Sequence, residues 1–309
     1  MVLNEDLLLE INSAWSKFDD LYLKKYPGDA LYHYTGNSSA VRGMLENRKI
    51  WLSPYNDVND PSEISHGMEL ALDEAKAIRS STTKPSDIKS YDLLIQVIGR
   101  YQAYSTQEFY FICFSEAGDE DISQWREYGD RGNGFCIEFL SKNIFYDPNR
   151  KQNLVGPGNP LLEVRPIVYD DAQKRRLLNS FFTSLNSFIL NSGPGGCVLV
   201  VMFLRQVCTY FKHKAYGPEK EWRTVVLSSQ GRLFLSYGTL QVFELSGQFR
   251  KKVVLDLPSQ MEPLDSIYKV TCGPKQNSSK CSATKHFIDS LQVGMTHQVQ
   301  VTHSRVPMV

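Results

Sequence analysis

Apolar residues recur along the chain in two patterns, one typical of amphipathic helices and the other of short strands. Helical spacing of apolar positions predicts helices at residues 4–25, 38–47, 61–79, 87–104, 119–128, 172–190, 197–212 and 282–291. Short apolar and β-branched runs predict strands at residues 31–36, 49–53, 109–115, 135–140, 167–169, 222–228, 233–243, 252–257, 267–272 and 297–304. Helices and strands mix without a regular strand–helix–strand alternation, which indicates an α+β fold.

The start of the third predicted helix has a complete set of capping signals. Asp60 suits the N-cap position, Pro61 suits the first helical position, and Glu63 stands where a capping-box acid reaches back. Helix capping is therefore a sufficient explanation for this acidic Asp–Pro motif.

Composition describes an ordinary globular protein. Of the 309 residues, 42% are hydrophobic and 22% are charged, which excludes a wholly disordered chain. The 34 basic and 34 acidic residues give a net charge of zero, so there is no electrostatic case for general binding to nucleic acid or to a membrane surface.

The placement of the cysteines and the hydropathy of the chain indicate which cellular compartment to expect. The six cysteines are scattered, mostly in apolar runs, and no pair has zinc-ligand spacing, so we expect reduced thiols and no metal site. Residues 1–6 carry acids where a secretory signal has basic residues, and the longest apolar run, residues 197–204, is too short to span a bilayer. We therefore expect a cytoplasmic protein with no membrane partner.

The common sequence signatures for nucleotide binding and hydrolysis are absent. The chain has neither a P-loop nor a glycine-rich dinucleotide motif, and it lacks HExxH and GxSxG. What remains is a set of polar and aromatic residues near the ends of predicted strands and helices: His33, Ser53, Asn59, Ser115, Trp125, Tyr128, Glu219, Glu221 and Arg223.

The two acids of this set lie two positions apart at the start of a predicted strand. A period of two places Glu219 and Glu221 on the same face, close enough to share a site and to shift each other's pKa. The alternative is a solvated strand edge, where charges discourage aggregation. Arg223 follows on the same face and would neutralise the acids in a purely structural cluster.

Each of the other candidates also has a structural interpretation. His33 stands between two tyrosines, where a histidine is more often hydrogen-bonded than catalytic. Trp125 and Tyr128 lie one helical turn apart, and such a pair is more often part of a core than a platform for stacking on a flat ring.

Taken in order, the motifs resemble a bacterial family known as domain of unknown function 2971. The matching pieces are YHYT at residues 32–35, WLS and NDPSE between residues 51 and 63, CFSE at 113–116, W-x-x-Y at 125–128, GFCIEF at 134–139, E-x-E-W-R at 219–223, CGPK at 272–275 and HSRVP at 303–307. The resemblance therefore extends over nearly the whole chain.

That family in turn resembles the ADP-ribosyltransferase superfamily at a distance. The resemblance implies a split β-sheet core with surrounding helices, forming one domain over residues 1–309. Within it, residues 1–27 would be an N-terminal helix and residues 259–309 a strand–helix–strand extension. The substrate implied is NAD, held in a cleft between two small sheets.

The resemblance also implies roles for individual residues. Glu221 would be the catalytic carboxylate, and Glu219 would orient or deprotonate the acceptor. His33 would contact the ribose on the adenosine side, and Ser115 would shape the nicotinamide pocket. Either Tyr128 or Tyr55 would stack on nicotinamide. The implied NAD-binding positions are His33, Tyr34, Thr35, Ser53, Ser115 and Tyr128.

Three functions remain open at this point. The first is transfer of ADP-ribose from NAD to a protein or nucleic acid, as in a toxin or anti-phage effector that an antitoxin or regulatory partner restrains. The second is an NAD glycohydrolase, in which water replaces the acceptor. The third is a non-catalytic binding module, because a fold does not by itself determine a function.

Overall fold

The computed structural model describes residues 28–36, 38–57, 62–101, 107–141, 164–191, 193–229, 232–233, 238–245, 248–256, 267–292 and 298–308. The helix predicted at residues 4–25 and the cap predicted at Asp60 and Pro61 lie outside these residues. Within them, helices and strands mix in the α+β manner that the sequence predicts.

Contacts divide the chain into two compact units. Residues 58–107 and 165–217 belong to a helical unit, and residues 26–57, 108–164 and 218–309 belong to a sheet unit. The expectation of one domain over the whole chain stays a prediction.

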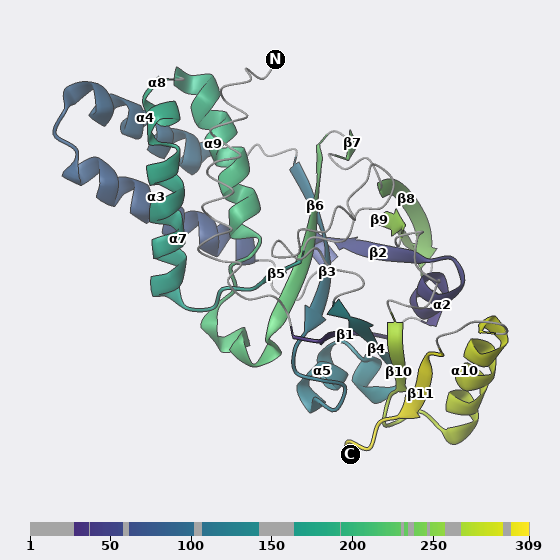
Figure 1. The fold of residues 1–309 in the computed structure, drawn as a ribbon. Coiled ribbons are helices and arrows are strands. Elements are labelled where there is room, and N and C mark those ends of the chain that lie inside the picture. The colour runs from purple at the N-terminus through teal and green to yellow at the C-terminus, as the bar shows by residue number, and fades with distance from the viewer. Residues whose placement is uncertain are drawn as a thin grey trace. The chain divides into compact units, whose positions relative to one another are not determined.

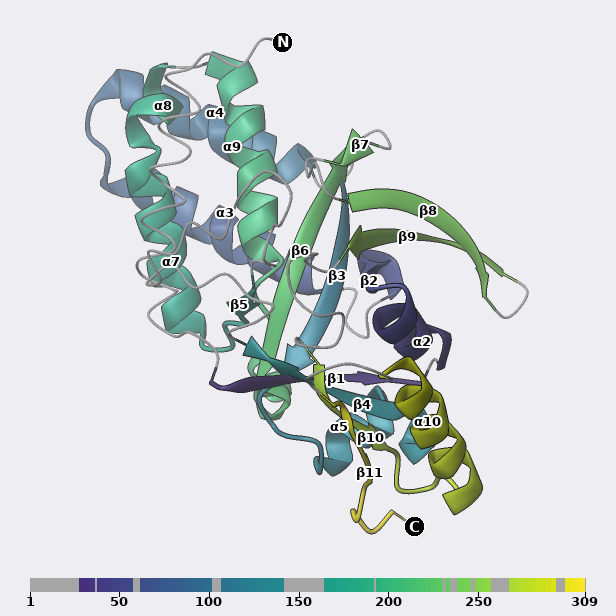
Figure 2. The same ribbon diagram turned by 45° about the vertical axis from the view of Figure 1, so that its right-hand side comes forward.

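The helical unit is built from helices that pack side by side in both ribbon views (Figures 1 and 2). They are α3 (Glu63–Ser81), α4 (Pro85–Tyr101), α7 (Asp171–Ser184), α8 (Asn186–Asn191) and α9 (Gly193–Cys208). Helices α3 and α9 approach closely at Gly67, where an added Cβ would lie 2.7 Å from Cβ of Cys208. A short strand, β5 (Arg165–Pro166), precedes α7, and a 3₁₀ segment, η3 (Lys214–Glu219), follows α9.

The helices of this unit differ from their predicted limits, most clearly those predicted at residues 172–190 and 197–212. The helix predicted at residues 172–190 is divided at Leu185 into α7 and α8. Asn186 begins α8, and its side chain accepts a hydrogen bond of 2.8 Å from the Tyr91 hydroxyl, which anchors the new start. Helix α9 begins at Gly193 rather than at residue 197, because a proline such as Pro194 is tolerated in a first helical turn.

The sheet unit holds the remaining elements. In chain order these are β1 (Ala30–Thr35), α2 (Ser38–Glu46), β2 (Lys49–Pro54), η1 (Tyr55–Asp57), β3 (Gln107–Ser115), α5 (Ile122–Glu127), η2 (Asp130–Gly132), β4 (Phe135–Leu140), β6 (Glu221–Ser229), β7 (Arg232–Leu233), β8 (Gly238–Leu245), β9 (Gln248–Asp256), β10 (Ile267–Cys272), α10 (Ser278–Leu291) and β11 (Gln300–His303). The final strand, helix and strand predicted by the sequence are thus present.

The sheet divides at its central strand, β3. The strand order is β11-β10-β4-β1-β3-β2-β9-β8, and β6 pairs with β3 as well. A strand has only two edges, so two of the three partners of β3 must share one edge. Strand β1 pairs with β3 at Ser115, and β2 pairs with it at Tyr110 and Phe111. The sheet therefore opens near the end of β3, in a mixed and branched arrangement.

One face of the sheet carries the main hydrophobic core of this unit. Its buried residues come from alternate positions of the strands, as in Tyr110, Ile112 and Phe114 of β3, and from Trp222 and Val226 of β6. Helices α2 and α10 contribute to the same core cluster through Val41, Met44, Leu45 and Ile288.

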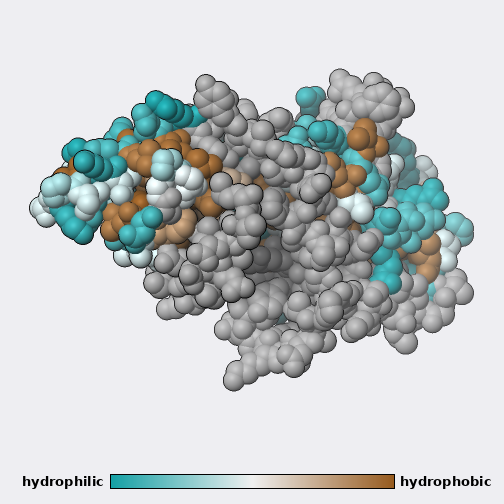
Figure 3. All heavy atoms as spheres, turned by 90° about the horizontal axis from the view of Figure 1, so that it is seen from above, coloured by the Kyte–Doolittle hydropathy of each residue, from teal (hydrophilic) through white to brown (hydrophobic). Residues whose placement is uncertain are grey.

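The described helices include none with the length and apolar character needed to cross a membrane. Where the face in Figure 3 belongs to the described part of the chain, polar and apolar residues are intermixed.

Candidate active site at the end of strand β3

The two acids of the E-x-E motif lie in different elements of secondary structure. Glu221 is the first residue of β6, whereas Glu219 ends η3. Between them, Lys220 has a φ of 45°, in the left-handed region that interrupts an extended strand. The backbone N–H of Glu116, just after β3, donates to the Lys220 carbonyl at 3.1 Å. The period-two argument for a shared face therefore fails across Lys220, because the chain is not extended there.

Glu219 lies among residues that the sequence analysis singled out. The Tyr128 hydroxyl donates to Oε1 of Glu219 at 3.1 Å, and the Ser115 hydroxyl donates to its backbone carbonyl at 2.7 Å. The side chain of Glu219 is only partly buried. Ser115, Tyr128 and Glu219 are far apart in sequence but converge at the end of β3.

Helix α5 positions Tyr128 for this contact. The Asp121 side chain caps the helix by accepting from the Gln124 N–H at 3.0 Å. Trp125 is fully buried, and Tyr128 stands at the C-cap one turn later. Sequence reasoning missed Gln124, whose Nε2 lies 3.5 Å from the Glu219 carbonyl. Its place four residues before Tyr128, on the same helical face, is the signal that could have found it.

Glu221 instead forms a buried ion pair with Arg223. Nε and Nη2 of Arg223 lie 2.8 and 2.6 Å from Oε1 of Glu221, and the two side chains are 1% and 5% exposed. The Arg223 guanidinium also stands 4.6 Å from the centroid of the Phe111 ring, in a cation–π contact. This is the neutralising arrangement that the sequence left open for Arg223.

His33 lies where β1 separates from β3. Its Nδ1 must donate to the Cys113 carbonyl, 2.8 Å away, because a carbonyl can only accept. Tyr32 pairs directly with Ser115, so those two side chains share a face of the sheet. His33 points to the other face, where its ring is 6.0 Å from that of Phe114.

The structure does not bring His33 and Glu221 together. Trp222 belongs to the same core cluster as Phe114, so strand alternation places Glu221 on the face opposite that cluster. The side chains of His33 and Glu221 therefore leave the sheet on opposite faces, although both of their strands pair with β3.

We expect His33 to be neutral in the folded protein. Burial lowers the pKa of its imidazole, and the bond to the Cys113 carbonyl opposes that effect only in part. A depressed folded pKa stabilises the fold above the unfolded value of about 6.5, and this contribution is lost as the pH falls. The free energy of unfolding should therefore decrease as the pH falls from 7 to 5.5, because the unfolded chain takes up a proton at His33 that the folded protein does not. Denaturant titrations should show a smaller decrease in His33→Gln, whose amide can still donate to Cys113. An equal decrease in both proteins would contradict a neutral His33.

The other predicted NAD-binding positions have structural partners. The Tyr34 hydroxyl donates to the Gly118 carbonyl at 2.6 Å, its ring meets Trp125 edge to face, and burial raises its pKa. Thr35 ends β1 opposite Phe135 of β4. Ser53 of β2 accepts from Nζ of Lys252 at 2.7 Å, on the other branch of the sheet.

Among the residues that the structure describes, no three His, Cys, Asp or Glu side chains are grouped as metal ligands would be.

Comparison with known proteins gives one match. Neither the curated proteins nor the solved structures include one that matches the chain. Residues 124–224 match a family described as "Protein of unknown function (DUF2971)". This stretch begins at Gln124 and contains Tyr128, Glu219, Glu221 and Arg223. Over these residues the match supports the resemblance to that family which the ordered motifs indicate.

Proposed function

We propose that the sheet unit cleaves NAD at its nicotinamide–ribose bond and transfers ADP-ribose to a macromolecular acceptor. The observation that carries this proposal is the convergence of Glu219, Tyr128 and Ser115 at the end of β3. The resemblance to ADP-ribosyltransferases supplies the substrate, because it implies a late carboxylate beside an aromatic ring and a hydroxyl.

The chemistry suits a partly exposed carboxylate. When the bond between the ribose C1′ and the nicotinamide nitrogen breaks, nicotinamide leaves with the electron pair and positive charge grows on the ribose, as in glycoside cleavage. A preorganised carboxylate stabilises that charge most effectively. The nucleophile of the acceptor then bonds to C1′ and gives up its proton.

Glu219 is our choice for this carboxylate, in place of Glu221. Glu219 is partly exposed and oriented by a phenol hydroxyl, whereas Glu221 is buried and its charge is offset by Arg223. In this assignment Glu221 and Arg223 act as a structural pair that holds the start of β6. The aromatic ring of Tyr128, whose hydroxyl contacts Glu219, would stack on nicotinamide.

A toxin or anti-phage effector is the biological role that fits such an activity, and an antitoxin or regulatory partner would restrain it. The alternative with specific support is a non-catalytic binding module. The Glu221–Arg223 pair and the opposite orientation of His33 favour that alternative, because both residues then serve the fold.

The proposed function is tested by incubating the full-length protein with NAD labelled in its adenylate group, with and without cell lysate. Transfer predicts that nicotinamide is released and that the label becomes attached to protein or nucleic acid. Nicotinamide release without attached label would identify a glycohydrolase. No release under either condition would reject NAD chemistry and favour the binding module.

A further inference from the structure

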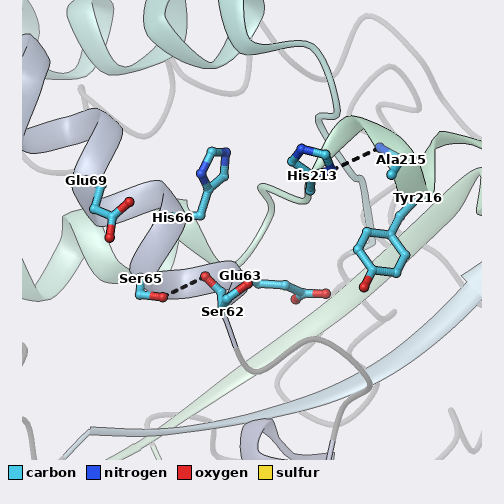
Figure 4. A pocket seen from close by; sticks show the side chains of 8 residues that line it. All are labelled: Ser62, Glu63, Ser65, His66, Glu69, His213, Ala215 and Tyr216. Carbon is cyan, nitrogen blue, oxygen red and sulfur yellow. Dashed lines mark hydrogen bonds between the residues drawn. The ribbon is translucent and has the colours of Figure 1, made fainter.

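A hollow of about 500 Å³ lies within the helical unit (Figure 4). It is formed by the first turns of α3 and by the segment after α9. The residues that line it are Ser62, Glu63, Ser65, His66, Glu69, His213, Ala215 and Tyr216. Two histidines from distant parts of the sequence thus meet at one opening, and their ring centroids are 6.3 Å apart.

Each of these imidazoles already uses one nitrogen as an acceptor. Nδ1 of His213 accepts from the backbone N–H of Ala215 at 3.2 Å. Nε2 of His66 lies 3.3 Å from Nζ of Lys174, whose ammonium can only donate, and 3.7 Å from Oδ1 of Asp171, which is beyond hydrogen-bond distance. In the neutral rings the remaining nitrogens, Nε2 of His213 and Nδ1 of His66, therefore carry hydrogen. The two imidazoles are left as hydrogen-bond donors, which suits a ligand that presents acceptor oxygens.

The two lysines beside the hollow are each paired with a carboxylate. Nζ of Lys174 is 2.8 Å from Oδ1 of Asp171, and the Lys174 side chain has no exposed surface. Nζ of Lys212 is 3.5 Å from Oε1 of Glu63, and both side chains are nearly fully buried. Glu63 is therefore an ion-pair partner inside the unit.

The charges of the other groups at the hollow are compatible with the binding of an anion. Glu69 is the other acid in the lining, and it is exposed, so water and salt screen its charge. His66 belongs to the first turn of the 19-residue helix α3, the end of the helix that carries the positive pole of its dipole.

We propose that this hollow binds the phosphate group of a phosphomonoester, with His66 and His213 as the donors. A tetrahedral oxyanion has enough acceptor oxygens to take a hydrogen bond from each ring at once. The Lys174–Asp171 pair fixes the His66 ring, and Ala215 fixes that of His213. This inference does not rest on NAD chemistry.

The test is a titration of the full-length protein, labelled with ¹⁵N in its histidine rings, with inorganic phosphate, 5′-AMP and adenosine at constant ionic strength. Phosphate and 5′-AMP should shift the ring signals of His66 and His213, whereas adenosine should not. His286, exposed on α10 of the sheet unit, provides the internal control and should not respond. A stronger response to 5′-AMP than to phosphate would assign the site to a nucleotide, and an equal response would assign it to free phosphate.

Single substitutions complete the test. His213→Ala should weaken phosphate binding about tenfold, because one hydrogen bond to a charged group is lost, and His286→Ala should leave it unchanged. His213 is exposed, so its replacement is not expected to unfold the protein. Equal shifts at His286, an equal response to adenosine, or unchanged affinity in His213→Ala would overturn the proposal.

Discussion

Replacing Arg223 with methionine is expected to lower the free energy of unfolding by about 3–5 kcal/mol. The substitution removes the guanidinium that lies 2.6 Å from Oε1 of Glu221, and it leaves a carboxylate that is only 5% exposed. A buried charge that loses its partner costs far more than the ion pair itself contributes. Chemical denaturation of the purified variant beside the wild type measures the difference.

The second member of the pair provides the control. Glu221→Gln should cost less than Arg223→Met, because the amide oxygen of glutamine can still accept the hydrogen bond from Nε of Arg223. In the double variant, Glu221→Gln should recover most of the stability lost in Arg223→Met, since no uncompensated charge then remains. Additive losses in the double variant would mean that the two side chains do not form the energetic pair that their geometry indicates.

Glu219→Gln is expected to reduce NAD cleavage about 100-fold, the usual loss when one group that stabilises transition-state charge is removed. The amide keeps the size of the side chain and can still meet the Tyr128 hydroxyl, but it carries no negative charge toward the ribose. Stability should change little because Glu219 is partly exposed. Initial rates of nicotinamide release, with denaturation curves for both proteins, separate the two effects.

Tyr128→Phe is the matched variant for this prediction. It removes the hydroxyl that donates to Oε1 of Glu219 and keeps the ring proposed to face nicotinamide. A loss of about tenfold is expected, since a hydrogen bond to a charged group orients the carboxylate. A rate equal to that of the wild type would mean that this contact has no part in the reaction.

Local patterns were sufficient to predict most elements of the fold. The continuous apolar run of residues 109–115 indicated β3, and the acidic start and paired aromatics near Trp125 indicated α5, although α5 is shorter than predicted. The break at Leu185 could not be read from the sequence, because it depends on the bond between Tyr91 and Asn186, which are far apart in the chain.

The candidate site was only partly predictable for the same reason. Sequence reasoning selected Ser115, Tyr128 and Glu219 singly, and the structure brings these three together. It could not foresee the left-handed conformation of Lys220, because of which Glu219 and Glu221 do not lie on one extended strand. Nor could it foresee the face on which His33 emerges, because that depends on the pairing of Tyr32 with Ser115.

The claim that Glu219 is the reacting carboxylate is tested most directly by measuring nicotinamide release from NAD by Glu219→Gln and Glu221→Gln side by side, per mole of folded protein. The account predicts that Glu219→Gln loses about 100-fold, while Glu221→Gln stays within about tenfold of the wild type. Full activity in Glu219→Gln together with a large loss in Glu221→Gln would contradict it.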